Sequence, residues 1–140
     1  MECTVKWSGG DAMTFLAETG SGHTAVMDGA PESGGRNLAP RPMEMVLVGT
    51  GGCAAYDVVV ILKKSGQDVT GCEVKVASER AETDPKVFTR IHMHFTVRGR
   101  ALKRNLVEHA IRLSHEKYCS ASIMLGKTAE ITKDFEIVEG

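Results

Sequence analysis

Two cysteines, Cys53 and Cys119, have surroundings that point to thiol chemistry. Cys53 follows the glycine-rich stretch GTGG at positions 49–52, inside the most apolar segment of the chain. A glycine within a helix costs roughly 0.8–1.0 kcal/mol relative to alanine, so these glycines indicate either close packing or free space beside the thiol. Cys119 lies where a short helix should begin, and backbone N–H groups at a helix start would stabilise a thiolate.

Each cysteine also has an ordinary structural interpretation. A single cysteine in the position of Cys119 is more commonly an inert buried thiol than a reactive one. Asp57 follows Cys53 by one helical turn, and an ionised carboxylate there would oppose thiolate formation unless it pairs with an arginine. The glycines, equally, could serve helix packing alone.

The remaining polar clusters do not predict a site. Ser114, His115 and Glu116 are consecutive on an expected helix and therefore point apart, which excludes a triad. His92 and His94 share one face of an expected strand between two arginines that would repel a metal ion, so a solvated sheet face is favoured. The four cysteines show no CxxC pair and no zinc-type spacing with histidine. We therefore expect no metal and no cofactor.

Composition places the chain among ordinary globular proteins. It has 140 residues, a net charge of -1, 42% hydrophobic and 25% charged residues. This length predicts a single domain over residues 1–140. The charge balance gives no reason to expect nucleic acid as a partner. The N-terminus lacks the layout of a signal peptide, so a reducing cytoplasmic location is expected.

Hydrophobic periodicity predicts an α+β fold. Three short strands come first, followed by a long loop from Gly29 to Pro42 that holds three prolines, three glycines and the two arginines Arg36 and Arg41. Loops of this length are often functional. The other expected elements are a helix to Lys64, strands over 72–80 and 87–98, an amphipathic helix over 102–117, a short helix over 120–125 and a last strand over 129–137.

The long helix is apolar on all sides, which indicates either complete burial or a membrane span. Asp57 argues against the membrane, because a central aspartate costs roughly 2.5–3.5 kcal/mol on insertion scales. So small a domain cannot cover such a helix by itself. A symmetric partner could supply the missing surface, so we expect a homodimer and no membrane association.

The segments PRPMEMVLVGTGGCAAYDVVVILKK and HEKYCSASIML resemble the OsmC/Ohr superfamily, specifically its YhfA-like branch. The resemblance covers nearly the whole chain. It implies an intertwined homodimer in which antiparallel sheets surround a long buried central helix. It also implies a thiol-dependent hydroperoxide reductase, with Cys53 as the peroxidatic and Cys119 as the resolving cysteine in an apolar pocket at the subunit interface. The implied partners are a small hydrophobic hydroperoxide and a lipoyl-type dithiol reductant.

The resemblance further implies a glutamate that orients an arginine over the thiolate. Glu44 matches the glutamate, although it lies nine residues before Cys53 where the family has ten. Spacing does not choose between Arg36 and Arg41, and the glycines flanking Arg36 favour it. A different class of function remains open: the same dimer pocket could bind an apolar small molecule, with the cysteines vestigial or regulatory.

Overall fold

The computed structural model describes residues 1–140, which form two compact units, Met1–Leu47 and Val48–Gly140. The boundary falls within the long helix α1 (Pro42–Lys64). The fold class is α+β, as predicted, with two three-stranded sheets.

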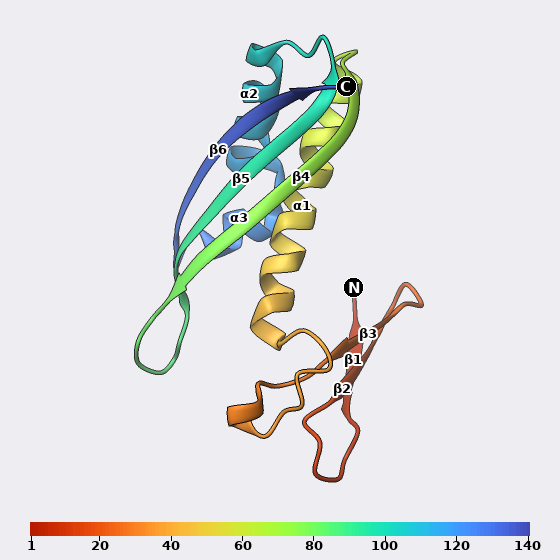
Figure 1. Cartoon of the computed structure of the whole chain (residues 1–140), viewed down its shortest axis with the longest axis vertical. Helices are drawn as coiled ribbons and strands as arrows, with labels where there is room; N and C mark the ends of the chain where they lie inside the picture. The colour runs from red at the N-terminus through yellow and green to blue at the C-terminus, as the bar shows by residue number, and fades with distance from the viewer. The chain divides into compact units, whose positions relative to one another are not determined.

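The first unit contains an antiparallel meander of three short strands, drawn in red and orange in Figure 1. These are β1 (Cys3–Trp7), β2 (Phe15–Thr19) and β3 (Thr24–Met27). Gly9 and Gly10 adopt positive φ angles of 83° and 70° in the first turn, a conformation that glycine allows without steric cost. All three predicted strands are therefore confirmed.

The loop after β3 is organised by one buried carboxylate. Asp28 is 1% exposed and accepts backbone N–H bonds from Gly29 at 2.7 Å, Leu38 at 3.1 Å and Arg36 at 3.4 Å. These bonds lower the pKa of Asp28, with the one from Leu38 contributing most. A short 3-10 helix, η1 (Pro31–Ser33), lies between them. One carboxylate thus ties three positions of the long loop together.

The second unit is built on a sheet of two long strands and one C-terminal strand, in the order β4-β5-β6. β4 (Asp68–Arg80) pairs antiparallel with β5 (Phe88–Arg100), while β6 (Glu130–Glu139) pairs parallel with β5. This parallel pairing differs from the expected antiparallel sheets. A parallel neighbour needs a crossover, and here the crossover consists of the helical segments between β5 and β6.

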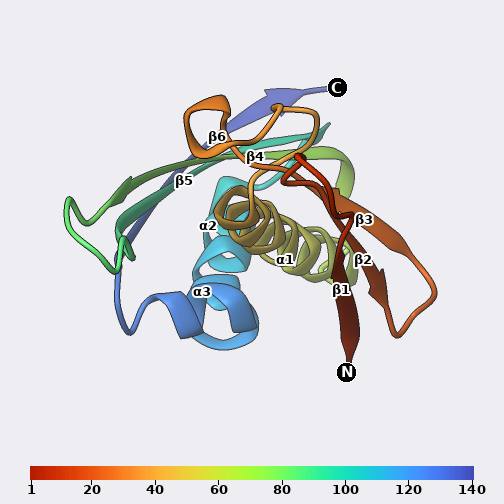
Figure 2. The same ribbon diagram turned by 90° about the horizontal axis from the view of Figure 1, so that it is seen from below.

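The helices of the second unit lie on one face of this sheet, as Figure 2 shows. They are the body of α1, α2 (Arg104–Leu113) and α3 (Ser120–Leu125). The inward side chains of β5 are almost completely buried against them; they are Ile91, Met93, Phe95 and Val97. Strand alternation therefore supplies the core, and the helices α1 and α2 close it with residues such as Leu62 and Val107.

Helix α1 buries one stripe and leaves another exposed. The buried residues follow a helical repeat and are Thr50, Gly51, Ala54, Val58 and Leu62. A Cβ at Gly51 would lie 3.0 Å from Cγ2 of Val76, so this glycine permits close packing on β4. By length and mean hydropathy, 1.9, α1 could also span a membrane. Its buried stripe is the pattern of a core helix that packs on a sheet.

Candidate functional site

Three potentially reactive side chains meet between α1 and the start of α3. The two Sγ atoms of Cys53 and Cys119 and a carboxylate oxygen of Asp57 all lie within 4.8 Å of one another. Cys53 and Asp57 are four residues apart on α1, so they lie on the same side of that helix. Cys119 arrives from the crossover between β5 and β6. The fold thus brings together two cysteines that are far apart in the sequence.

A π-helix over Ser114–Tyr118 sets the position of Cys119. The N–H of Cys119 donates to the carbonyl of Ser114 at 2.8 Å, which closes this wider turn. The Ser114 hydroxyl is buried and lies within hydrogen-bond distance of the Asp57 carboxylate at 3.3 Å and the Ala54 carbonyl at 3.4 Å. Such π segments are frequent at functional sites. Ser114 therefore ties the crossover to α1 beside the thiols.

The two thiols differ in exposure. Cys119 is 0% exposed, whereas Cys53 is half-buried. Cys119 is the N-cap of α3, and the N–H of Ser122 lies 3.5 Å from its Sγ, which is the helix-start contact predicted from the sequence. Burial nevertheless outweighs this contact and raises the pKa of the Cys119 thiol, and the neighbouring Cys53 acts in the same direction. Cys53 is thus the thiol with access to solvent.

Glu44 and the two candidate arginines belong to the first unit. The Glu44 carboxylate accepts the backbone N–H of Arg41 at 2.9 Å and its guanidinium at 3.3 Å. These contacts lower the pKa of Glu44 and cap the first turn of α1, as a glutamate at the third helical position often does. Arg36 instead contributes its backbone N–H to Asp28. Glu44 therefore contacts Arg41 rather than Arg36, the arginine that the sequence favoured.

A cavity of about 400 Å³ opens beside the thiol cluster. Asp57 is the one member of the cluster that lines it. The other lining residues are partly apolar or aromatic and partly polar; they are Val60, Ile61, Leu113, Tyr118, Lys64, Ser65 and His109. Asp57 thus belongs both to the cluster and to this cavity, whose lining is mixed in polarity. An organic molecule seated there would lie next to the cluster.

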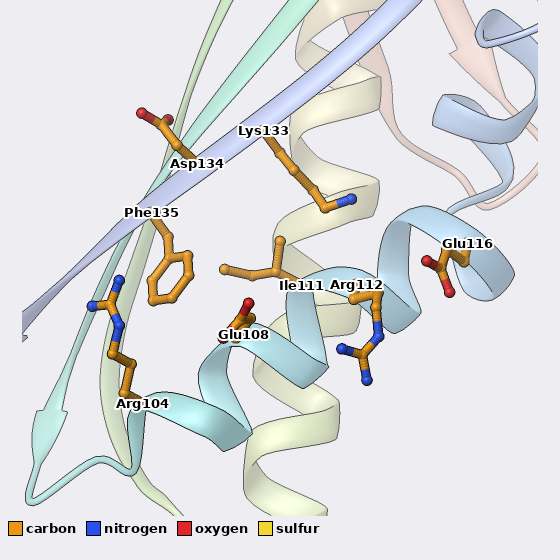
Figure 3. A pocket seen from close by; sticks show the side chains of 8 residues that line it. All are labelled: Arg104, Glu108, Ile111, Arg112, Glu116, Lys133, Asp134 and Phe135. Atoms are coloured by element: carbon orange, nitrogen blue, oxygen red, sulfur yellow. The ribbon is translucent and has the colours of Figure 1, made fainter.

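A second cavity, of about 340 Å³, lies between α2 and β6 and has a different character. Its side chains are mostly charged, as Figure 3 shows, and they come from α2 and the following π-helix on one side and from β6 on the other. Arg104 stacks on the ring of Phe135 at 4.6 Å, and Lys133 lies among Arg112 and Glu116. None of Cys53, Asp57 and Cys119 lines this cavity, so it is separate from the thiol site.

The two strand histidines have carboxylate partners that the sequence analysis did not foresee. Asp134 of β6 accepts contacts from both His92 at 2.9 Å and His94 at 2.8 Å, and Glu136 lies 3.5 Å from His94. The parallel register of β5 and β6 places these side chains on one exposed face. Asp134 raises the pKa of His94, so the pairing is strongest when that ring is protonated. This remains a solvated sheet face, as predicted.

Comparison with known proteins places this site in a family. The model of the family described as OsmC-like protein matches residues 34–133, which include both cysteines and most of the helices and strands. The chain therefore belongs to the OsmC-like family.

Its relatives agree with this assignment. Protein YhfA of Escherichia coli strain K12 is 53% identical over 138 residues, which cover 99% of this chain and 98% of YhfA. A structural genomics target of known structure is 50% identical, with a TM-score of 0.89 and complete coverage of both chains. The organic hydroperoxide resistance protein OhrB of Bacillus subtilis is 17% identical and covers 97% of this chain and 98% of its own, with a TM-score of 0.63. At that identity the likeness to OhrB concerns the fold.

Proposed function

We propose that the protein is a thiol-dependent hydroperoxide reductase in which Cys53 is the peroxidatic and Cys119 the resolving cysteine. The observation that carries this proposal is the meeting of the two thiols within 4.8 Å, with Cys53 half-buried and Cys119 fully buried. The thiol that must meet the oxidant is the accessible one. The resolving thiol, Cys119, is buried next to Cys53 and is shielded from the oxidant.

The reaction has two balanced steps. The Cys53 thiolate attacks the distal oxygen of an organic hydroperoxide, the O–O bond breaks, and the alkoxide leaves as the alcohol after taking a proton. Cys53 becomes a sulfenic acid. The Cys119 thiol then condenses with it to form a disulfide and water. An external dithiol of the lipoyl type restores both thiols by disulfide exchange.

The surroundings of the cluster support an apolar organic substrate. The cavity of about 400 Å³ that Asp57 lines has an aliphatic part formed by Val60, Ile61 and Leu113, beside the polar residues Lys64, Ser65 and His109. A hydrophobic hydroperoxide would bury its alkyl group there, which stabilises binding by about 0.8 kcal/mol for each buried CH2. The fold shared with a hydroperoxide resistance protein agrees with this choice.

For the arginine that assists the thiolate, the contact with Glu44 favours Arg41. A glutamate fixes a guanidinium best through direct contact, and Arg41 makes that contact at 3.3 Å. Replacing Arg41 by alanine should slow the reaction of Cys53 with hydroperoxide about 10- to 100-fold, as expected for the loss of a charge that stabilises a transition state. Arg36→Ala is the matched control and should react at the normal rate. The reverse result would assign the role to Arg36.

The experiment that tests the proposal counts thiols. The reduced protein is mixed with cumene hydroperoxide, and free thiols are titrated over time. We expect rapid loss of two thiols, no rapid loss in Cys53→Ser, and a sulfenic acid that dimedone traps in Cys119→Ser. Cys72→Ser is the control and should still lose two thiols. Thiols that survive prolonged exposure would refute the proposal.

A second candidate function follows from the same apolar cavity. If the thiols resist oxidation, the cavity walls formed by Val60, Ile61 and Leu113 still fit a small apolar ligand. Native mass spectrometry of the freshly purified protein would detect a retained molecule, and Leu113→Lys should abolish its retention. The two candidates thus predict different outcomes for the same preparation.

We also propose that the protein acts as a homodimer. Val48 and Tyr56 on α1 are 62% and 72% exposed, which is unusual for apolar side chains on the most hydrophobic helix of a chain. Gly52 lies between them in the helical repeat, and nothing within 4 Å would meet a Cβ there. A second copy packed on this stripe would cover both side chains and could approach closely at the glycine.

A further inference from the structure

We propose that Cys53, Asp57 and Cys119 also form a three-ligand site for a thiophilic divalent cation such as Zn²⁺. This site shares Cys53 and Cys119 with the proposed function, and metal binding there does not require turnover of peroxide. It starts from geometry: two sulfur atoms and one carboxylate oxygen lie mutually within 4.8 Å, although they come from two separate segments of the chain.

The spacing of the donor atoms fits a tetrahedral cation. Zinc binds thiolate sulfur at about 2.3 Å and carboxylate oxygen at about 2.0–2.2 Å, so tetrahedral ligand atoms lie roughly 3.5–3.8 Å apart. Donor atoms within 4.8 Å of one another need to move inward by only about an ångström or less to reach those distances. Side-chain rotation alone supplies such a shift.

The ligand types also suit such an ion. Thiolates select soft and borderline metals, and one carboxylate with two thiolates gives a mixed donor set that zinc accepts. Three protein ligands leave the fourth tetrahedral position open for water or another small ligand. The site would therefore resemble an open zinc site rather than a closed structural one.

Neighbouring groups hold two of the three ligands in place. The buried Ser114 hydroxyl lies 3.3 Å from the Asp57 carboxylate, and the N–H of Ser122 lies 3.5 Å from Sγ of Cys119. Hydrogen bonds of this kind orient metal ligands and limit their motion. A bound cation would also explain why a carboxylate lies beside two thiols. Without a cation, the Asp57 carboxylate would repel a neighbouring thiolate.

A bound cation would change how the thiols meet an oxidant. Cys53 would no longer present a free thiolate, because its lone pair would be shared with the metal. Metal and hydroperoxide would then compete for the same sulfur. The metal-bound protein should accordingly lose thiols to cumene hydroperoxide more slowly than the metal-free protein, and a chelator should restore the rate.

Cobalt spectroscopy tests the site directly. Reduced protein, freed of metal by a chelator and desalted without air, is titrated with Co²⁺ and then with Zn²⁺. We expect a thiolate-to-cobalt charge-transfer band and the visible bands of tetrahedral Co²⁺, with one equivalent bound per chain and displaced by Zn²⁺. Asp57→Asn removes a direct ligand and should weaken Co²⁺ binding at least as much as the loss of an outer-shell partner does, which is about 10- to 100-fold. Cys72→Ser, which removes a thiol outside the cluster, should bind normally.

Distinct outcomes separate this inference from the proposed function. Absence of the cobalt bands, or unchanged affinity in both Asp57→Asn and Cys119→Ser, would overturn the metal site. Circular dichroism of each variant checks that it is folded. Thiol loss to peroxide is measured on the metal-free protein in the presence of chelator, so peroxidase activity can fail while cobalt still binds, and the converse can also occur.

Discussion

At Cys119, burial and hydrogen bonding act on the same thiol in opposite directions. The N–H of Ser122 favours the thiolate, while complete removal from water disfavours it, and the pKa of Cys119 is raised as a result. In the proposed role of resolving cysteine, Cys119 would tolerate this, because it would attack an electrophilic sulfenic sulfur held next to it. For that role, closeness of the Cys119 thiol to Cys53 matters more than its ionisation.

Alkylation rates should reflect these environments. With iodoacetamide at mildly alkaline pH, Cys119 should react more slowly than the exposed Cys3, because Cys119 is buried and its raised pKa leaves less thiolate. Peptide mass spectrometry at successive times gives the rate at each site. Equal rates at Cys3 and Cys119 would contradict the burial of the second thiol.

At the scale of residues, the sequence identified several candidate site residues but did not predict which of their side chains contact one another. The cysteine pair came from resemblance to a family, because nothing in the spacing of Cys53 and Cys119 indicates contact. From the sequence alone, Asp57 is expected to oppose thiolate formation, and Ser114 is expected to point away from its neighbours His115 and Glu116. The contact between Asp57 and Ser114 depends on a π-helical turn, and no local signal in SHEKY announces one. Contacts between residues that are distant in the sequence can be identified only once the tertiary structure is known.

At the scale of elements, strands and helices were largely predictable, because alternation and helical periodicity are strong in this chain. The expected short helix over 120–125 matches α3, and the long helix matches α1 to within a residue. The parallel pairing of β6 was missed because a strand's pattern does not reveal the direction of its neighbour. The start of β4 was placed four residues late, beyond the bulge between Val69 and Gly71.

The loop after β3 should lose stability in acid. Because the folded pKa of Asp28 is below its ordinary value of 3.8, its contribution is present above that pH and is lost as the pH falls through the folded pKa. Asp28→Asn should lower the melting temperature at pH 7, and the difference from the wild type should shrink below about pH 4. Differential scanning calorimetry measures both, with Asp11→Asn as the control. A pH-independent difference would contradict this role.

The end of the β4–β5 ladder should be sensitive to one methyl group. A Cβ at Gly99 would lie 2.4 Å from the Asp68 carbonyl oxygen and 2.7 Å from Leu102, so Gly99→Ala should destabilise the fold by about 1–3 kcal/mol. Gly71→Ala is the matched control on the adjacent strand, where the nearest atom is at 3.4 Å. Urea unfolding of the two variants gives the comparison. Equal free energies of unfolding would show that the backbone at Gly99 yields easily.

At the scale of the whole molecule, the exposed stripe on α1 should determine the assembly. We expect a homodimer in sedimentation equilibrium, and we expect Val48→Lys to weaken it because a charge would have to be buried in an apolar interface. Lys86→Glu, in the loop between β4 and β5, is the control and should leave the assembly unchanged. A wild-type protein that stays monomeric at high concentration would contradict the proposal.

The crossover that carries Cys119 has a consequence for biosynthesis. β5 can pair with β4 as soon as both have emerged from the ribosome, but β6 can join the sheet only after the helical crossover has been made. Cys53 therefore spends part of translation without its neighbour, as an unshielded thiol on an apolar helix. During that interval the fold does not yet shield Cys53 from oxidants or from other thiols.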